Sequence, residues 1–349
     1  MTPTAARLGR AALALWLMVG AAAAGAAAPT DDCRASMRNR RVTLVVPYTA
    51  GGGFDTYARA LAPVLEKVSG ARVTVSNLPG AGGRLGMKAV ADSGADAIRL
   101  GLFEGANMIH IARTSTELGL DKFRPLGTVA IEAQVWVARP GFALTPSVRQ
   151  PIVASVNEMA TFVVEVALAG EALGLKVRAT PGYKGSVDRF AAVLRGEVDI
   201  TANSVTSGIR AARAGDLAVA LLLTDAPDPA LPGVPHLAGK GGIVERFTEG
   251  AAPERRARAV QLAQSVVDLS PSFRTIVASA QLPAPTLQCL GDLVEASLFD
   301  EGFARAASGF DRPVRPRDRQ ATLALFERLD ARSREQEALL RRLAAELGR

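Results

Sequence analysis

Apolar and polar positions alternate with two different periods along the first third of the chain. The stretch 41–48 (RVTLVVPY) is apolar and β-branched, which is typical of a strand, and apolar residues over 57–68 follow at the three- and four-residue spacing of a helix. The same pair of signals recurs at 71–77 and 87–91, and 98–103 (IRLGLF) predicts a third strand. This strand-helix alternation predicts a parallel sheet with helices on both faces.

The alternation restarts in the middle of the chain, where a second βα unit is expected. Strands are predicted at 129–140, 151–156, 176–183, 198–204 and 217–224, and helices at 161–175 and 186–196. Two βα units in tandem predict two lobes.

The remainder of the chain shows helical periodicity at 251–268, 290–308 and 321–347. The last segment places apolar residues along one stripe that Ser333 and Gln336 interrupt. Because a coiled coil needs an unbroken apolar seam, we expect this segment to pack back on its own domain instead of binding a partner.

Two glycine-rich stretches follow the first two strands: PYTAGGGFDT at 47–56 and NLPGAGGRLG at 77–86. Glycines at a strand-to-helix turn let a ligand approach the backbone, and the helix that follows presents unpaired N–H groups to an anion. In a parallel sheet both turns lie at the edge where ligands bind. The alternative interpretation is that the glycines only permit tight packing.

Nucleotide-binding interpretations of these turns are weak. Gly80, Gly82 and Gly86 have the spacing of a dinucleotide fingerprint, but no acidic residue ends the next strand where a ribose would need it. The Gly-Lys-Ser/Thr of a P-loop is missing as well.

The N-terminal residues indicate export. Arg7 and Arg10 precede an apolar run at 11–25, and small residues follow it. This is the pattern of a cleaved signal peptide over 1–28. A retained membrane anchor is the alternative, but the run is short and rich in alanine. We therefore expect a periplasmic protein.

The chain has two cysteines, Cys33 and Cys289. In an exported protein they can form a disulfide between the N-terminus and the C-terminal third, and two buried free thiols are the alternative. No Cys or His spacing indicates a metal or redox site, so neither a metal nor a cofactor is expected.

The net charge of +7 does not indicate a nucleic-acid partner. Arg7 and Arg10 contribute two of these charges, and 312–349 hold ten Arg against six Asp or Glu. The rest of the chain is nearly neutral, and no recognisable reading element accompanies the basic residues.

Catalytic motifs are also missing from the sequence. His110 and His236 lie far apart, and neither belongs to a metal-ligating HExxH. There is no GxSxG nucleophile elbow. The sequence favours a protein that is not an enzyme.

Two long stretches resemble a known family. The segment 42–86 (VTLVVPYTAGGGFDTYARALAPVLEKVSGARVTVSNLPGAGGRLG) is similar to the opening of the tripartite tricarboxylate transporter substrate-binding proteins, the Bug family of extracytoplasmic solute receptors. The segment 179–237, with its YKG turn and its VDITANS strand, resembles a second family motif. Together they cover about a third of the chain.

The resemblance implies an α/β fold, a type II-like periplasmic binding protein of two lobes, each a mainly parallel sheet flanked by helices. Domain 1 would comprise 40–130 plus 226–349, and domain 2 would comprise 131–225. The lobes would close over a small carboxylated solute and deliver it to membrane transporter subunits, or report it to a sensor ectodomain. A monomer is expected.

The resemblance also implies a ligand-binding set. In domain 1 it consists of Tyr48, Ala50, Gly52, Asp55, Gly82 and Gly83, with the last two and Gly52 as N–H donors to the carboxylate and Asp55 ordering its loop. In domain 2 it consists of Ser155, Asn157, Thr161, Asn203 and Ser204.

Two departures from the family pattern affect the ligand. Glu104 stands where a small polar residue is usual, so an acid faces the expected carboxylate site. The turn at 156–161 (VNEMAT) replaces a stretch rich in Gly, Ser and Thr. The alternative hypothesis is therefore an interaction or sensory protein that kept the fold but lost or changed the ligand. An enzyme acting on a carboxylate is the third.

Overall fold

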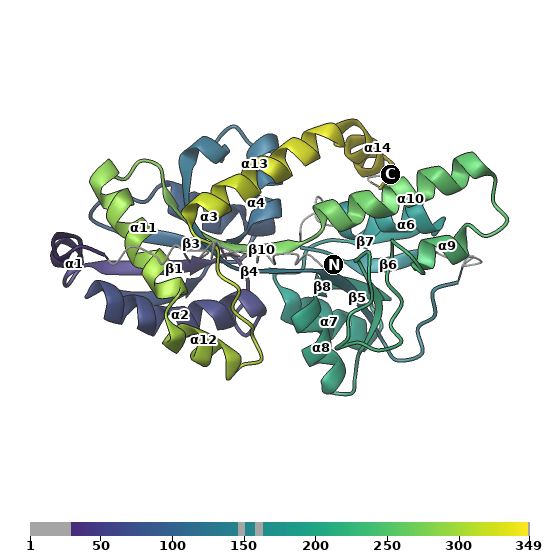
Figure 1. Cartoon of the computed structure of the whole chain (residues 1–349), viewed down its shortest axis with the longest axis horizontal. Coiled ribbons are helices and arrows are strands. Elements are labelled where there is room, and N and C mark those ends of the chain that lie inside the picture. Colours follow the sequence, from purple (N-terminus) through teal and green to yellow (C-terminus); the bar gives the residue numbers. More distant parts are fainter. Residues whose placement is uncertain (1–28, 146–150, 158–162, 348–349) are drawn as a thin grey trace, which may run out of the picture.

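The computed structural model describes residues 29–145, 151–157 and 163–347. In this part of the chain two five-stranded sheets form two lobes that lie side by side (Figure 1). The predicted two-lobed α/β class is confirmed.

The first sheet has the strand order β2-β1-β3-β10-β4. β1 is parallel to β2 and β3, whereas β10 is antiparallel to β3 and β4. The bounds of its strands are β1 (Arg41–Val46), β2 (Arg72–Asn77), β3 (Ile98–Glu104), β4 (Phe123–Glu132) and β10 (Ser272–Ser279).

The second sheet repeats this arrangement in the order β7-β6-β8-β5-β9. β6 is parallel to β7 and β8, and β5 is antiparallel to β8 and β9. Its strands are β5 (Gln134–Ala138), β6 (Ile152–Ser155), β7 (Val177–Thr180), β8 (Ile200–Ser204) and β9 (Ala218–Leu222). Each lobe therefore has one antiparallel strand, which lies next to the edge strand.

Helices cover both faces of the first sheet, as alternation along β1 requires. Leu44 packs in one core and Val45 in the other. The first core includes residues of α2 (Gly53–Ser69), α11 (Ala284–Leu298) and α12 (Glu301–Ser308). The second includes residues of α3 (Arg84–Ala91), α4 (Gly105–Thr114) and α13 (Arg319–Glu335).

The short helix α1 (Asp31–Met37) is joined to α11 by a disulfide between Cys33 and Cys289. This confirms the disulfide and excludes the alternative of two free thiols. The bond links positions 256 residues apart, so it closes a loop around most of the chain.

The second lobe is covered in the same way. One face packs against α6 (Leu168–Leu173), α9 (Ile243–Phe247) and α10 (Pro253–Leu269), and the other against α7 (Ser186–Arg195) and α8 (Val205–Arg213). A π-helical turn, Val163–Ala167, leads into α6. The 3-10 turns Ala81–Gly83 and Leu120–Lys122 lie in the first lobe.

Part of the segment 226–349 departs from the expected domain 1. Helices α9 and α10 pack in the core of the second lobe, where Leu262 and Val266 are buried. The chain returns to the first lobe only at β10, and α14 (Glu337–Leu347) places Leu343 back in the core of the second (Figure 1). The apolar faces of these helices, and not their order in the chain, decide which lobe they join.

Strand β10 is missing from the sequence expectation, which treated the C-terminal part as helical. Its sequence SFRTIVAS is a β-type run whose eight residues are all buried between β3 and β4. The expected helix 290–308 is broken where Asp300 caps α12, and the expected helix 321–347 is broken at Gln336.

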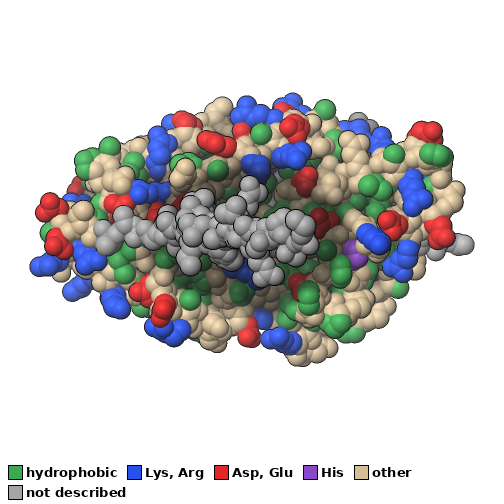
Figure 2. All heavy atoms as spheres, in the orientation of Figure 1, with side chains coloured by type: hydrophobic (Ala, Val, Ile, Leu, Met, Phe, Trp, Pro, Cys, Tyr) green, Lys and Arg blue, Asp and Glu red, His purple; other side chains and the backbone are tan. Residues whose placement is uncertain are grey.

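Within the described residues, no helix combines the length and the apolar character needed to cross a membrane. The same residues contain no group of three or more His, Cys, Asp or Glu placed to hold a metal ion. The face of the molecule in Figure 2 carries basic and acidic side chains intermixed, without a broad patch of one sign.

Candidate functional site

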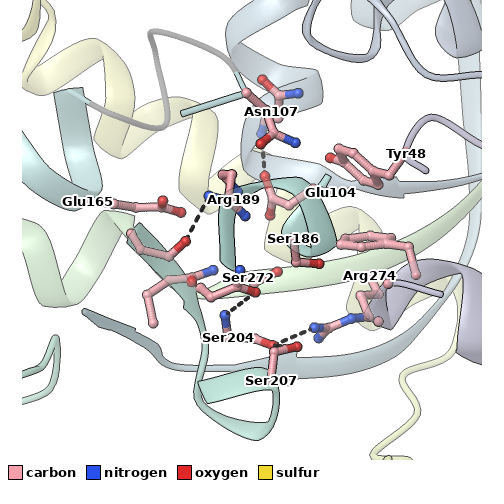
Figure 3. A pocket seen from close by; sticks show the side chains of 17 residues that line it. Tyr48, Glu104, Asn107, Glu165, Ser186, Arg189, Ser204, Ser207, Ser272 and Arg274 are labelled. Carbon is pink, nitrogen blue, oxygen red and sulfur yellow. Dashed lines mark hydrogen bonds between the residues drawn. The ribbon is translucent and has the colours of Figure 1, made fainter. Parts of the chain in front are cut away.

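A polar cavity of about 70 Å³ lies between the lobes (Figure 3). We call it the interlobe cavity. Six residues of the expected ligand-binding set line it: Tyr48, Gly52, Glu104, Asn157, Asn203 and Ser204. Eleven further residues complete its walls: Gly53, Phe54, Asn107, Gln134, Glu165, Ser186, Arg189, Ala202, Ser207, Ser272 and Arg274.

The first glycine turn is ordered by Asp55, which does not line the cavity. Its carboxylate accepts hydrogen bonds from the N–H of Gly51 (2.9 Å) and from Nε of Arg59 (3.0 Å). Burial raises the pKa of Asp55, but these bonds lower it more, so the pKa lies below its usual value. Gly51 has φ +81°, which only glycine adopts readily.

The same turn meets the second lobe at close range. A Cβ on Gly52 would lie 3.2 Å from Oγ of Ser186, and one on Gly185 would collide with Thr49. The N–H of Thr49 donates to the carbonyl of Lys184 across the lobes (3.3 Å). The bare backbone at this turn therefore lets the two lobes approach each other.

The second glycine turn does not line the interlobe cavity. The N–H of Gly83 is used within the turn, where it donates to the carbonyl of Gly80 (2.9 Å), and Nδ2 of Asn107 donates to the carbonyl of Gly82 (2.9 Å). The N–H of Gly83 is thus already bonded, and its expected role as a donor to the ligand stays a prediction. Gly82 and Gly83 line a neighbouring cavity of about 340 Å³, which shares Tyr48 and Asn157 with the interlobe cavity.

The remaining members of the expected set lie elsewhere. Ala50 is exposed and lies outside the walls of both cavities. Ser155 is buried at the end of β6 without lining the interlobe cavity. Thr161 lies outside the described residues.

Glu104 ends β3 and caps α4, which explains an acid at this position. Its carboxylate accepts hydrogen bonds from the backbone N–H groups of Ala106 (3.3 Å) and Asn107 (2.6 Å) and from that of Phe273 on β10 (3.3 Å). Burial raises the pKa of Glu104 to about 7 even though these bonds and Arg274 lower it. The protein thus places its own carboxyl group on a helix N-terminus that faces the cavity.

A second acid, Glu165 of the π-helical turn, faces the cavity from the other lobe (Figure 3). Burial raises its pKa to about 8; the charge of Arg189 lowers it and that of Glu104 raises it further. The carbonyl of Glu165 accepts a hydrogen bond from Nε1 of Trp136 (2.7 Å), which fixes the turn. Arg189 donates to the carbonyl of Ala202 (2.8 Å), and burial lowers the pKa of its guanidinium.

Charged and hydroxyl side chains from both lobes form the floor of the cavity. Arg274 is ion-paired with Glu132, and its Nη2 donates to Oγ of Ser204 (3.0 Å). Nη1 of Arg312 donates to Oγ of Ser207 (2.9 Å). We call these residues, together with Thr206, which donates to Glu132, the hinge cluster, since β4 passes into β5 beside it.

Several polar atoms around the cavity have no hydrogen-bond partner among the described residues. These are Oε1 of Gln134, Oδ1 of Asn157, Nδ2 of Asn203 and Nε of Arg189. Gln134 is 5% exposed and Asn203 is 7% exposed. Buried polar groups are almost always hydrogen-bonded, so these atoms mark a place where a further molecule is expected.

Three charged residues that line the cavity were not in the ligand-binding set expected from the sequence: Glu165, Arg189 and Arg274. Glu165 and Arg274 are each the single charge in a short apolar run, VVEVALAG at 163–170 and SFRTIVAS at 272–279, whereas Arg189 lies in a helix that also holds Asp188 and Arg195. A single charge inside an apolar run indicates a buried group that needs a partner. That signal was available for Glu165 and Arg274, although it does not say which partner each group meets.

Comparison with known proteins gives relatives of one kind. No family model matches the chain. The UPF0065 protein in the TAR-I ttuE-ttuC' intergenic region of Agrobacterium vitis is 30% identical over 217 residues, 58% of this chain and 61% of that protein. The chain thus spans less than two thirds of that relative. Protein BugT of Bordetella pertussis is 27% identical over 241 residues, 63% of this chain and 71% of that protein.

A solved structure shares the fold. MatC from Rhodopseudomonas palustris with bound malate superposes with a TM-score of 0.64 at 20% identity, over 86% of this chain and 99% of that one. The shared two-lobed fold agrees with the family motifs in 42–86 and 179–237. In its sequence relatives and its motifs, the chain is similar to proteins of the Bug family.

Proposed function

We propose that this protein is a periplasmic, non-enzymatic receptor that closes its two lobes over a small carboxylated solute and delivers it to a membrane transporter. The observation that carries this proposal is the interlobe cavity. Its walls come from both sheets, and buried polar atoms on them have no partner within the described residues. A solute that bonds to both walls would hold the lobes together.

The site residues follow from the same geometry. We assign Tyr48, Glu104 and Asn107 to the wall of the first lobe, and Asn203, Arg189 and Glu165 to that of the second. The contact between Gly52 and Ser186 lets the lobes meet at the rim. A solute stabilises this closed arrangement only by its differential affinity for it.

The comparisons support the chemical class of the solute. MatC, which shares the fold, has malate bound in its structure. In our protein the guanidinium of Arg189 and the amide of Asn203 offer donors to one carboxylate. A second solute, or a partner protein that belongs to a transporter or a sensor, would bind to this protein outside the cavity.

A second candidate function is an interaction protein that has lost the ligand. One observation favours it: Glu104 and Glu165 together bring two acids to a cavity of only about 70 Å³. Such a protein would keep the lobes closed without any solute.

A ligand screen distinguishes the two. The mature chain, prepared from residue 29 onward, would be examined by native mass spectrometry for a co-purified solute and by thermal shift against small acids and amino acids. For a receptor we expect stabilisation that grows with solute concentration. Ser186→Phe, which fills the cavity rim, should abolish this stabilisation, whereas Ser308→Phe on an exposed site of α12 should not. No stabilisation by any compound, with no solute in the purified protein, would favour the interaction protein.

A further inference from the structure

We propose that the solute carries an amino group as well as a carboxylate, and that Glu165 binds the amino group. This inference rests on the proposed receptor function and names the solute class for the same cavity. The solute would be a small zwitterion and not a simple dicarboxylate.

The first step is an account of the four charges that line the cavity. Glu104 already accepts three backbone N–H bonds. Arg274 is ion-paired with Glu132 and bonded to Ser204. The carboxylate of Glu165, by contrast, is influenced among the described residues by the charges of Arg189 and Glu104 and by no hydrogen bond. The guanidinium of Arg189 donates to the carbonyl of Ala202, and its Nε has no partner within the described part of the chain. One acid and one base therefore remain for the solute.

The second step concerns two neutral side chains on the same walls. Oε1 of Gln134 can only accept a hydrogen bond, and Nδ2 of Asn203 can only donate one. Both side chains are more than nine-tenths buried and lack partners at these atoms within the described part of the chain. An ammonium group supplies donors only and a carboxylate supplies acceptors only. A zwitterion therefore complements both sets of groups, its ammonium with Glu165 and Gln134 and its carboxylate with Arg189 and Asn203.

A dicarboxylate lacks this complementarity. Its second carboxylate would lie in the same cavity as Glu104 and Glu165, and once these acids are deprotonated, like charges in a low dielectric repel. The cavity volume of about 70 Å³ is small. The cavity thus fits an amino acid with a short chain.

The titration of Glu165 gives the proposal a distinctive pH dependence. Burial raises the pKa of Glu165 to about 8, and an ammonium beside it would lower that pKa by stabilising the carboxylate. Binding then releases a proton below pH 8, so the affinity for a zwitterion rises as the pH rises toward 8. For a dicarboxylate the sign is opposite, because deprotonation of Glu165 adds repulsion.

Other charged groups surround Glu165. Glu104 and Arg189 face it within the cavity. On its other side a second cavity brings His110 and Arg113 of α4 and Glu337 and Arg341 of α14 near the same turn. Burial lowers the pKa of His110 to about 4, so it stays neutral from pH 6 to 8 and does not mask the signal of Glu165.

The test uses pairs of probes that differ only in the amino group. Glycine is compared with acetate, β-alanine with propionate, and 4-aminobutyrate with butyrate, and succinate represents the dicarboxylates. Binding to the mature protein is measured by calorimetry at pH 6 and pH 8. The same titrations are made on Glu165→Gln and on Glu327→Gln, a matched control on an exposed site of α13.

We expect at least one amino acid to bind at least tenfold more tightly than its amine-free partner, with higher affinity at pH 8 than at pH 6. Glu165→Gln should remove this preference and Glu327→Gln should preserve it. Should Glu165→Gln fail to fold, the paired probes and the pH series on the unchanged protein still decide the matter.

Two results would overturn the inference, and they are distinguishable. Amine-free acids or succinate that bind as well as the amino acids, to both the unchanged protein and Glu165→Gln, would refute recognition of an amine while leaving the receptor function intact. A protein that binds none of these probes, gains no stability from any other solute and carries no co-purified solute would refute the receptor function together with the inference.

Discussion

The hinge cluster and the walls of the interlobe cavity are both polar and buried, yet their groups are satisfied differently. In the hinge cluster the charged groups have partners: Arg274 is ion-paired with Glu132 within the first lobe, and Arg274 and Arg312 donate across the lobes to Ser204 and Ser207. On the walls, Glu165 and the amides of Gln134 and Asn203 face the cavity with atoms that have no partner among the described residues.

On the proposed function, this difference separates groups that support the fold from groups that would bind the solute. A buried ion pair contributes little net stability, but it becomes costly when one partner is removed. An unpartnered buried group already costs stability, so replacing it by an apolar group of similar shape costs little. Substitutions in the hinge cluster should therefore lower mainly the stability of the protein. Substitutions on the cavity walls should lower mainly the affinity for the solute.

The largest effect is expected for Arg274→Met in the hinge cluster. The side chain is 2% exposed, and its loss leaves the carboxylate of Glu132 buried without its cation. We expect the free energy of unfolding to fall by about 3–5 kcal/mol. Chemical denaturation of the mature protein measures it.

A double mutant sharpens this prediction. Adding Glu132→Gln to Arg274→Met removes the stranded charge, so the pair should be less destabilised than the sum of the two single changes. Strictly additive losses would mean that the ion pair within the first lobe does not couple these two residues.

The next effect is a dependence of stability on pH that arises from the walls. Burial raises the pKa of Glu104 to about 7 and that of Glu165 to about 8, above the ordinary value of 4.5. Between pH 4.5 and the raised pKa of each residue, the carboxyl group is protonated in the folded protein and deprotonated in the unfolded chain. The free energy of unfolding should thus fall as the pH rises from about 4.5 to about 8, by up to about 1.4 kcal/mol per pH unit for each carboxyl group.

Melting curves from pH 5 to pH 9 test this dependence. Glu165→Gln should flatten the slope, whereas Glu327→Gln on the exposed face of α13 should retain it. A solute-free protein whose stability is constant over this range would show that neither acid is held protonated by burial.

The sequence predicted the local features of the molecule and missed those that depend on distant segments. The turn after β1, the strands of both βα units and the disulfide partners are properties of short stretches or of a single pair, and they were predicted. Strand β10 was missed because its place between β3 and β4 follows from a long return of the chain from the second lobe.

The candidate site was predictable to about the same extent. The sequence predicted the turn at Gly52. It did not predict that this turn lets the two lobes approach each other, because the close neighbour Ser186 belongs to the other lobe. Glu104 was noticed as an anomaly, and only the structure shows that it caps α4. Glu165 lies in a π-helical turn, and the charge of Arg189, which acts on it, comes from 24 residues further along the chain, so no local pattern indicates that the two residues share the cavity.

A smaller effect is expected at the rim, for Gly52→Ala. Gly52 has φ −75°, so alanine is tolerated by the backbone, but its Cβ would lie 3.2 Å from Oγ of Ser186 and resist closure. Solute affinity should fall several-fold while the free energy of unfolding changes by less than about 1 kcal/mol. The control is Gly94→Ala, where a Cβ meets nothing within 4 Å. Equal affinities for the two variants would remove the rim contact from the closing mechanism.

The smallest effect on stability is expected for Gln134→Leu on the cavity wall. Leucine is close in shape to glutamine, and the change removes Oε1, which is buried without a partner among the described residues. Because the folded protein loses no hydrogen bond at that atom, we expect the free energy of unfolding to stay within about 1 kcal/mol of the original value or to rise. The affinity for the solute should nevertheless fall, since an acceptor is lost from the wall. A large loss of stability instead would place Gln134 with the hinge cluster, as a residue that supports the fold.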